Sequence, residues 1–89
     1  MNSHVTARFR KNFEALPQEI QDKAKVAYKI WTNNPNHPSL HFKQVHHTDP
    51  IYSIRVGLYH RALGVKKANT MIWFWIGTHE EYNTLISTL

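Results

Sequence analysis

The stretch from Tyr52 to Ile76 reads YSIRVGLYHRALGVKKANTMIWFWI, and it decides the fold. Its first seven residues are apolar at every second position, which is the period of a strand with one buried face. A reversal near residues 57–60 leads to a second strand over residues 61–66. After a short turn, residues 70–76 form a nearly continuous apolar run that fits a central strand buried on both faces. Because the connections are short, these strands are expected to pair antiparallel.

Two helices are predicted before this region. Apolar residues recur at near-helical spacing, first as Val5, Phe9, Phe13 and Leu16 and then over residues 20–31. Pro17 suits the first position of the second helix, where its missing N–H is not needed. Asn33-Asn34-Pro35 ends that helix, because proline cannot continue it. The two segments therefore predict a helical hairpin that needs an apolar surface to cover.

The remaining segments complete a predicted α+β fold. Residues 40–46 are expected to form a further strand, followed by a turn at residues 48–50. Thr78-His79-Glu80-Glu81 matches a capping box, which predicts a short helix over about residues 79–86. The prediction is a single domain over residues 1–89, in which an N-terminal helical hairpin packs on a curled antiparallel sheet of about four strands, with a short C-terminal helix.

The composition excludes several classes of protein. Of the 89 residues, 42% are hydrophobic and 12% aromatic, which is enough for a packed core. The absence of cysteine excludes a disulfide framework, a zinc finger and a thiol nucleophile. No apolar run approaches the roughly 20 residues that cross a bilayer, and no apolar leader begins the chain. A cytoplasmic protein that makes no contact with membranes is expected.

Positive charge gathers in the second half of the chain. The sequence has 11 Lys and Arg against 6 Asp and Glu, a formal charge of +5. Residues 32–79 contain a single acid, Asp49, together with five Lys or Arg and six histidines: Lys43, Arg55, Arg61, Lys66, Lys67, His37, His41, His46, His47, His60 and His79. Such a surface attracts polyanions, so nucleic acid or an acidic protein partner is expected.

Four motifs follow one another in the sequence: Leu16-Pro17-Gln18-Glu19-Ile20, Tyr52-Ser53-Ile54-Arg55-Val56, His60-Arg61, and Ile76-Gly77-Thr78-His79-Glu80-Glu81-Tyr82. In this order and spacing they resemble the RelE/ParE superfamily, the toxins of type II toxin–antitoxin modules. The resemblance covers nearly the whole chain. Members of the family usually begin with a strand ahead of the first helix. Here only residues 1–4 precede that helix, so the strand is expected to be lost or very short.

The resemblance implies one of two activities. RelE-like members cut mRNA, generally in the ribosomal A site and without a metal, whereas ParE-like members inhibit DNA gyrase and cleave nothing. Because one fold carries both activities, individual residues must decide between them. Either activity implies a cognate antitoxin as protein partner and no cofactor.

Two arginines and a histidine–tyrosine pair are the candidate catalytic residues. Metal-free RNA cleavage needs a base for the 2′-hydroxyl, an acid for the leaving oxygen and cations around the phosphate. Arg55 projects away from the apolar face of its strand, and Arg61 matches a frequent strand arginine of the family, so both are interpreted as phosphate ligands. The parity of Arg61 with Leu63 means that a bulge or a curled sheet is needed to expose it.

His79 and Tyr82 lie three residues apart at the start of the last predicted helix, and hence on neighbouring surface. Histidine can move a proton near neutral pH, and tyrosine can orient a substrate or stack on a base. The open alternative is that His79 only begins the helix and Tyr82 only packs on the sheet.

Four further residues are candidate substrate ligands. His41 and Lys43 are expected on one ridge of the strand over residues 40–46, together with His47, and Tyr59 and His60 are expected near the following reversal. An ordinary solvated face and a simple turn are the alternatives. No metal site is expected, because the histidine spacing matches no standard ligand pattern. Trp73, Phe74 and Trp75 are interpreted as core residues, with at most one ring reaching the groove.

The leading hypothesis is therefore a toxin that cleaves mRNA, associated with the ribosome and neutralised by an antitoxin. The first alternative is a ParE-like, non-catalytic inhibitor that binds DNA gyrase through the helical hairpin. The second alternative is an inactive basic domain that only binds nucleic acid.

Overall fold

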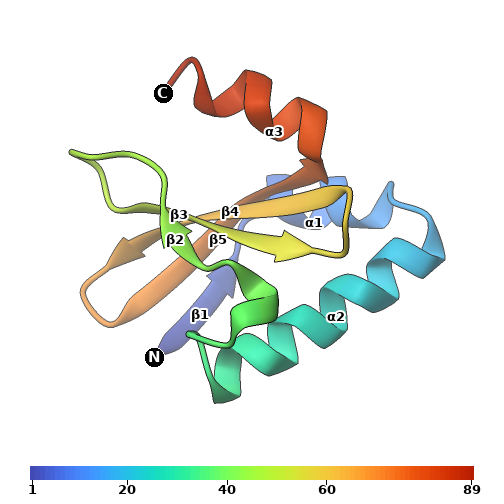
Figure 1. Ribbon diagram of the computed structural model, residues 1–89, viewed down its shortest axis with the longest axis horizontal. Helices are drawn as coiled ribbons and strands as arrows, with labels where there is room; N and C mark the ends of the chain where they lie inside the picture. Colours follow the sequence, from blue (N-terminus) through green and yellow to red (C-terminus); the bar gives the residue numbers. More distant parts are fainter.

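The computed structural model describes residues 1–89 and has helices on both sides of one five-stranded sheet (Figure 1). In chain order the elements are β1 (Asn2–Val5), α1 (Ala7–Glu14), α2 (Gln18–Asn33), the 3-10 helix η1 (Pro38–Leu40), β2 (Lys43–Gln44), β3 (Ile51–Val56), β4 (His60–Lys67), β5 (Thr70–Thr78) and α3 (His79–Ile86). The predicted helical hairpin, the three central strands and the C-terminal helix are confirmed. None of the helices is both long and apolar enough to cross a membrane.

The sheet has the order β1-β5-β4-β3-β2 and is mixed. Neighbours from β2 to β5 are antiparallel, whereas β1 is parallel to β5, with Asn2 opposite Thr70. The prediction of about four antiparallel strands is therefore one strand short. The N-terminal strand is very short, as expected, but it is present, and Val5 belongs to it rather than to the first helix. Its sequence, Asn-Ser-His-Val, has no strand pattern of its own. The strand is stabilised by pairing with β5, which lies near the other end of the chain.

The predicted strand over residues 40–46 is reduced to the two residues of β2. Pro38 and Ser39 begin η1 instead, and the His37 side chain accepts a hydrogen bond from the Ser39 amide at 3.2 Å. His41 then adopts a left-handed conformation with φ of 46°, which interrupts an extended chain. The 3-10 turn places Leu40 in the core, where it is 1% exposed.

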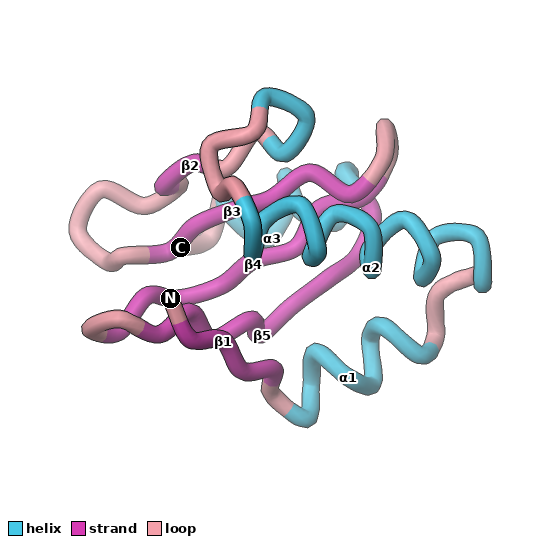
Figure 2. Tube along the Cα trace, turned by 90° about the horizontal axis from the view of Figure 1, so that it is seen from below, coloured by secondary structure: helices cyan, strands magenta, loops and turns pink.

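The sheet separates two hydrophobic cores. On one face, α2 presents Trp31, which is 1% exposed and contacts Trp73 edge-on at 5.3 Å between ring centroids. On the other face, α3 covers Leu63 and Trp75 with the ring of Tyr82. Figure 2 shows that α1 and α2 lie on the same side of the sheet and diverge from their joint, so that they form a V. The central strands therefore have to be apolar on both faces.

A bulge in β5 divides its aromatic residues between the two cores. Leu63 lies opposite Trp75 and Gly64 opposite Trp73, so Phe74 has no partner on β4. The extra residue allows Trp73 to face the helical hairpin and Trp75 to face α3. Gly64 makes room for this arrangement, because a Cβ atom there would lie 2.8 Å from the Trp73 ring.

The predicted capping box at the start of α3 is confirmed. The Thr78 hydroxyl accepts a hydrogen bond from the Glu81 amide at 3.1 Å, and the Glu81 carboxylate accepts one from the Thr78 amide at 2.9 Å. The hydrogen bonds that the Glu81 carboxylate accepts from the Thr78 amide and the Thr78 hydroxyl hold the pKa of Glu81 below its usual value, because they favour the charged form. The cap fixes where α3 leaves the sheet and therefore where His79 lies.

Replacing the cap should destabilise the protein. We expect Thr78→Ala to lower the free energy of unfolding by about 0.5–2 kcal/mol, because the Glu81 amide loses its acceptor. Thr84→Ala is the matched control, since Thr84 is exposed inside the same helix and alanine is a better helix former there. Urea unfolding of the three proteins measures both changes, and an equal loss in the two variants would contradict the role of the cap.

Candidate active site

Two arginines lie directly opposite each other on β3 and β4. Arg55 and Arg61 are cross-strand partners. They share the face of Ser53 and Leu63, two residues that contact or pack against Tyr82 of α3. Arg61 thus keeps the predicted parity with Leu63, and it is half-buried near the start of β4. The sequence predicted that a bulge or a curled sheet would expose it, and a bulge does interrupt the pairing of β4 with β5 between Leu63 and Gly64.

Neither arginine has an acidic partner. The two ion pairs of the protein join Lys23 to Glu19 and His46 to Asp49. The arginines are held by main-chain oxygens instead: Arg55 Nε donates to the Gly57 carbonyl at 3.1 Å, and Arg61 Nη1 donates to the His60 carbonyl at 2.8 Å. Burial lowers the pKa of Arg61, and the neighbouring charge of Arg55 lowers it further. Both groups remain charged, so an anion is the ligand that this pair lacks.

His79 begins α3 close to this pair. Arg61 lies opposite Gly77 on β5, two residues before His79. The His79 amide donates to the Tyr59 carbonyl at 2.7 Å, which ties the start of α3 to the β3–β4 turn. The His79 and Tyr82 ring centroids are 5.7 Å apart, and the imidazole Nδ1 is 3.3 Å from Asn83 Nδ2. The half-buried imidazole is thus held from two sides while one edge stays open.

Tyr82 is 5% exposed, and its hydroxyl donates to the buried Ser53 at 3.4 Å. Its ring therefore supports His79 and packs on the sheet, and it offers no open face to a base. The start of α3 carries Glu80 and Glu81 and is already capped. An anion on this surface is consequently attracted by the arginines and not by the helix terminus.

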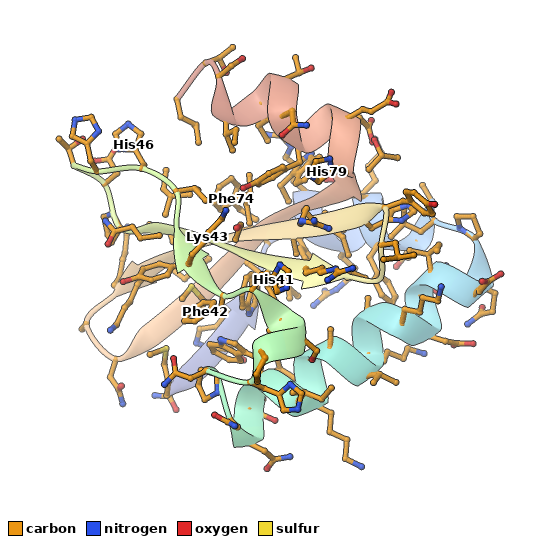
Figure 3. All side chains as sticks on the ribbon, in the orientation of Figure 1. His41, Phe42, Lys43, His46, Phe74 and His79 are labelled. Atoms are coloured by element: carbon orange, nitrogen blue, oxygen red, sulfur yellow. The ribbon has the colours of Figure 1, made fainter.

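His41 and Lys43 extend the cationic surface from the β2 side. Arg55 Nη1 lies 3.4 Å from His41 Nε2. Lys43 is the cross-strand partner of Ser53 and is exposed. In the view of Figure 3, Lys43 and Phe74 lie to the left of His41 and His79. Five cationic or titratable side chains make up this surface, which we call the cationic groove: His41, Lys43, Arg55, Arg61 and His79.

The expected ridge does not include His47. Because β2 has only two residues, the chain leaves the sheet after Gln44, and the His46 and His47 rings stack on each other in the following loop at 5.5 Å. The Asp49 amide donates to His46 Nδ1 at 2.9 Å, which holds that loop together. No group of three or more metal-ligating side chains occurs in the protein.

Tyr59 and His60 are separated by the structure. Tyr59 is 73% exposed in the β3–β4 turn, where Gly57 has φ of +64°. His60 is the first residue of β4, half-buried, and one position out of phase with Arg61. Burial lowers the pKa of His60, Lys23 lowers it further, and Glu81 acts in the opposite direction. Near neutral pH His60 is therefore a neutral hydrogen-bonding group, whereas Tyr59 presents an open aromatic ring.

The aromatic run of β5 behaves as predicted. Trp73 and Trp75 are 3% and 7% exposed, and Phe74, the residue of the bulge, is the one ring that is half-exposed. Phe74 is labelled in Figure 3. The sequence could not indicate which ring reaches the surface, because strict alternation would have placed Trp73 and Trp75 on the same face.

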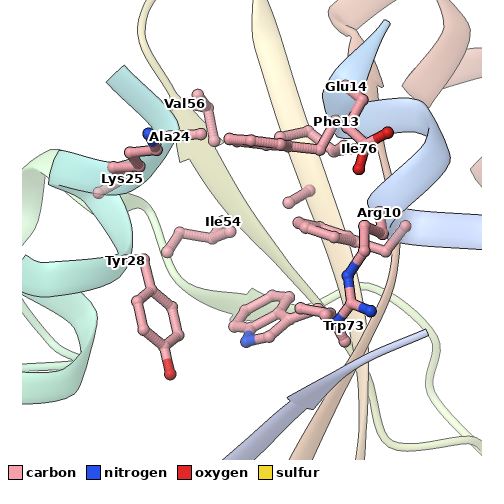
Figure 4. A pocket seen from close by; sticks show the side chains of 14 residues that line it. Arg10, Phe13, Glu14, Ala24, Lys25, Tyr28, Ile54, Val56, Trp73 and Ile76 are labelled. Atoms are coloured by element: carbon pink, nitrogen blue, oxygen red, sulfur yellow. The ribbon is translucent and has the colours of Figure 1, made fainter. Parts of the chain in front are cut away.

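A second surface, not predicted from the sequence, is an apolar groove between α1, α2 and the opposite face of the sheet (Figure 4). Its volume is about 470 Å³, and its apolar walls include Phe9, Phe13, Tyr28, Ile54 and Trp73. The Phe9 and Phe13 rings are stacked at 6.4 Å, and no residue of α1 is buried. The apolar stripe of the first helix was the available signal, because the stripe faces this groove and is only half covered.

Inorganic phosphate should stabilise the protein through Arg55 and Arg61. At a phosphate concentration 100 times its Kd, the stabilisation would be about 2.7 kcal/mol. We expect Arg61→Gln to melt at a higher temperature than the wild type without phosphate, because the repulsion between two like charges is removed. The same variant should gain little from added phosphate. Lys29→Ala, on the exposed side of α2, is the control, and an equal phosphate response in all three proteins would contradict the site.

The chain resembles known proteins both in sequence and in fold. A sequence model of the ParE-like toxin domain family matches residues 18–84. The chain is also similar to a chain of the RelB–RelE antitoxin–toxin complex from Methanococcus jannaschii, at 18% identity and a TM-score of 0.72 over 91% of this chain and 95% of that one.

YafQ from E. coli strain BL21(DE3) is similar at 12% identity and a TM-score of 0.73, over 91% of this chain and 96% of that one. The toxin-antitoxin complex RelBE2 from Mycobacterium tuberculosis contains a chain with 17% identity and a TM-score of 0.68, over 88% of this chain and 96% of that one. At these identities the structures establish the fold alone. No curated protein sequence matches the chain.

Proposed function

This chain belongs to the ParE-like toxin domain family, within the RelE and ParE toxins of toxin–antitoxin modules, and from that membership we propose that it cleaves mRNA without a metal. The observation that carries the proposal is the cross-strand pair Arg55–Arg61, which is half-buried, has no acid beside it and lies close to an imidazole. An inhibitor that acts only by docking on a protein has no need of such an arrangement.

The chemistry is a transfer within the RNA chain. The 2′-hydroxyl oxygen attacks the adjacent phosphorus, its proton passes to a base, and the bond from phosphorus to the 5′-oxygen breaks as that oxygen takes up a proton. Negative charge gathers on the phosphate oxygens in the transition state, where the fixed positive charges of Arg55 and Arg61 stabilise it. The products are a 2′,3′-cyclic phosphate and a 5′-hydroxyl.

His79 is the proposed proton-transfer residue, because its imidazole lies at the open end of the groove and histidine titrates near neutral pH. Tyr82 fixes the orientation of His79 through ring contact.

His41 lies within 3.4 Å of Arg55 and supplies a second imidazole, and the exposed Lys43 attracts the RNA backbone. Tyr59 lies in the β3–β4 turn beside the arginine pair, where its open ring can stack on a base, whereas His60 is one position out of phase with Arg61 and does not face the pair.

The proposed substrate is mRNA on the ribosome, and the proposed partner is a cognate antitoxin. Two of the similar structures are complexes of a RelE-type toxin with its antitoxin. An antitoxin with acidic residues would neutralise this chain by covering the cationic groove, since the formal charge of the chain is +5.

Induced expression of the wild type should arrest growth and create new 5′ ends in an abundant mRNA, detected by primer extension. We expect His79→Ala to lower the cleavage rate by about 10²–10⁴-fold, the usual effect of losing a proton-transfer residue. Arg61→Ala should lower it by about 10²–10³-fold through lost charge stabilisation. Lys29→Ala should cleave like the wild type, because it removes a cation far from the groove.

Cleavage that survives in both His79→Ala and Arg61→Ala would contradict the proposed site. Growth arrest without any new mRNA 5′ ends would contradict the proposed activity. Normal growth on induction would leave a basic domain that only binds nucleic acid.

One observation favours the alternative of a gyrase inhibitor. The apolar groove between α1 and α2 is open, and neighbouring side chains such as Tyr28 are 45% exposed. An uncovered apolar surface of this kind is typical of a protein-binding site. It lies on the opposite face of the sheet from Arg55 and Arg61, so the two surfaces can be tested separately.

A supercoiling assay with purified DNA gyrase separates the two activities. Under the proposed function the wild type leaves the supercoiling rate unchanged. Under the alternative it inhibits supercoiling, Phe13→Glu abolishes the inhibition because a carboxylate enters the apolar groove, and His79→Ala inhibits as strongly as the wild type. The second pattern would replace the proposed function with gyrase inhibition.

A further inference from the structure

A second cavity, of about 510 Å³, lies between α2, η1 and the β3–β4 turn. Its size falls within the roughly 300–1,000 Å³ of small-molecule sites. We propose that this cavity binds a nucleobase of the RNA whose phosphate is held by Arg55 and Arg61. The proposal rests on the proposed function and adds to it a site that reads the base beside the bound phosphate.

One guanidinium belongs to both sites. The Arg55 backbone lies opposite Arg61, in the cationic groove, yet its side chain also lines the cavity. This is possible because β2 stops at the pair of Lys43 with Ser53, so the edge of β3 is free from residue 54 onward. The Arg55 side chain turns along this free edge to the Gly57 carbonyl at 3.1 Å and to His41 at 3.4 Å. A phosphate on Arg55 therefore brings its own nucleotide to the mouth of the cavity.

The walls suit the flat faces of a base. Half of the lining is aliphatic, from Val26, Ala27 and Ile30 on α2, Leu40 on η1, and Leu58 in the turn. Val26 and Leu58 are 59% and 65% exposed, although both face this common space. Two exposed aliphatic side chains from different elements, next to a guanidinium plane, offer the apolar contact and the stacking surface that an unpaired base needs.

The polar lining favours the edge of a base over a second phosphate. Asp22, Lys23 and Ser39 line the cavity. The Asp22 carboxylate repels anions, and the Lys23 ammonium is already paired with Glu19 at 3.6 Å. One Asp22 oxygen accepts a hydrogen bond from Gln18 at 2.9 Å, which leaves the other oxygen free for an amino group. A carboxylate accepts from the amino group of cytosine, adenine or guanine. Uracil offers only its N3–H, which lies between two carbonyl oxygens that a carboxylate repels. The cavity should therefore prefer amino-bearing bases over uracil.

Three small probes separate the base from the phosphate: cytidine 5′-monophosphate, uridine 5′-monophosphate and ribose 5-phosphate. Each is titrated into isotope-labelled protein, with NMR shifts recorded for the methyl groups of Val26, Ile30 and Leu58 and for the side-chain N–H groups of Arg55 and Arg61. We expect all three probes to shift the arginine signals, and only the two nucleotides to shift the methyl signals. Cytidine monophosphate should bind about two- to tenfold more tightly than uridine monophosphate, the effect of one hydrogen bond.

Two exposed positions test the assignment without endangering the fold. Leu58→Ala should weaken both nucleotides and leave ribose 5-phosphate unchanged. Asp22→Ala should remove the preference for cytidine, and Lys29→Ala, on the same helix but outside the cavity, should bind all three probes like the wild type.

The outcomes distinguish this proposal from the proposed function. If ribose 5-phosphate shifts the arginine signals and the nucleotides shift nothing more, the base site is wrong and the phosphate site remains. Methyl shifts that persist unchanged in Leu58→Ala, or equal affinity for the two nucleotides in the wild type, would likewise overturn it. If none of the probes shifts the arginine signals, the phosphate site fails, and the proposed function and the base site fail with it.

Discussion

The structure depends on one constraint, namely that the central strands must be covered on both faces. Trp73 and Trp75 lie two residues apart on β5, and strict alternation would place both on one face. The bulge at Phe74 turns Trp75 to the other face, so each side of the sheet acquires a large aromatic residue to bury. Fully burying a large apolar side chain contributes about 1.5–3 kcal/mol. Both α2 and α3 are therefore needed, and each is held by its own ring, Trp31 and Tyr82.

Incomplete coverage of the sheet creates the functional surfaces. On one face α3 has only eight residues, which cover Leu63 and Trp75 but leave Arg55 and Arg61 open beyond its start. On the other face α1 diverges from α2 and leaves an apolar groove. A cationic surface and an apolar surface thus lie back to back across one sheet. The proposed nucleic-acid substrate and a protein partner would therefore engage this toxin from opposite sides of the sheet.

The cationic groove shows a conflict between stability and function. Two half-buried arginines opposite each other repel, and no acid relieves the repulsion. A protein selected for stability alone would place an acid or a neutral residue at one of these positions. Main-chain carbonyls of Gly57 and His60 hold the guanidinium groups in place without neutralising their charge. The charge therefore remains available for a ligand, which is the arrangement that a site for a phosphate ester requires.

The sequence by itself determined the helical hairpin, its end at Asn34-Pro35, the three central strands, the capping box of α3, and the position of Arg55 on the surface opposite the hairpin. These features follow from local periodicity, proline and capping chemistry, which act between residues close in the chain. Only the tertiary structure decided the pairing of β1 with β5, the shortening of β2, the burial of Tyr82 against Ser53, and the separation of His47 from Lys43. The pairing of β1 and the burial of Tyr82 depend on contacts between segments far apart in the sequence, and the pattern of a short segment carries no information about a distant partner, such as Thr70 for Asn2. The shortening of β2, which also separates His47 from Lys43, follows from the 3-10 turn and the left-handed conformation of His41, which periodicity alone did not reveal.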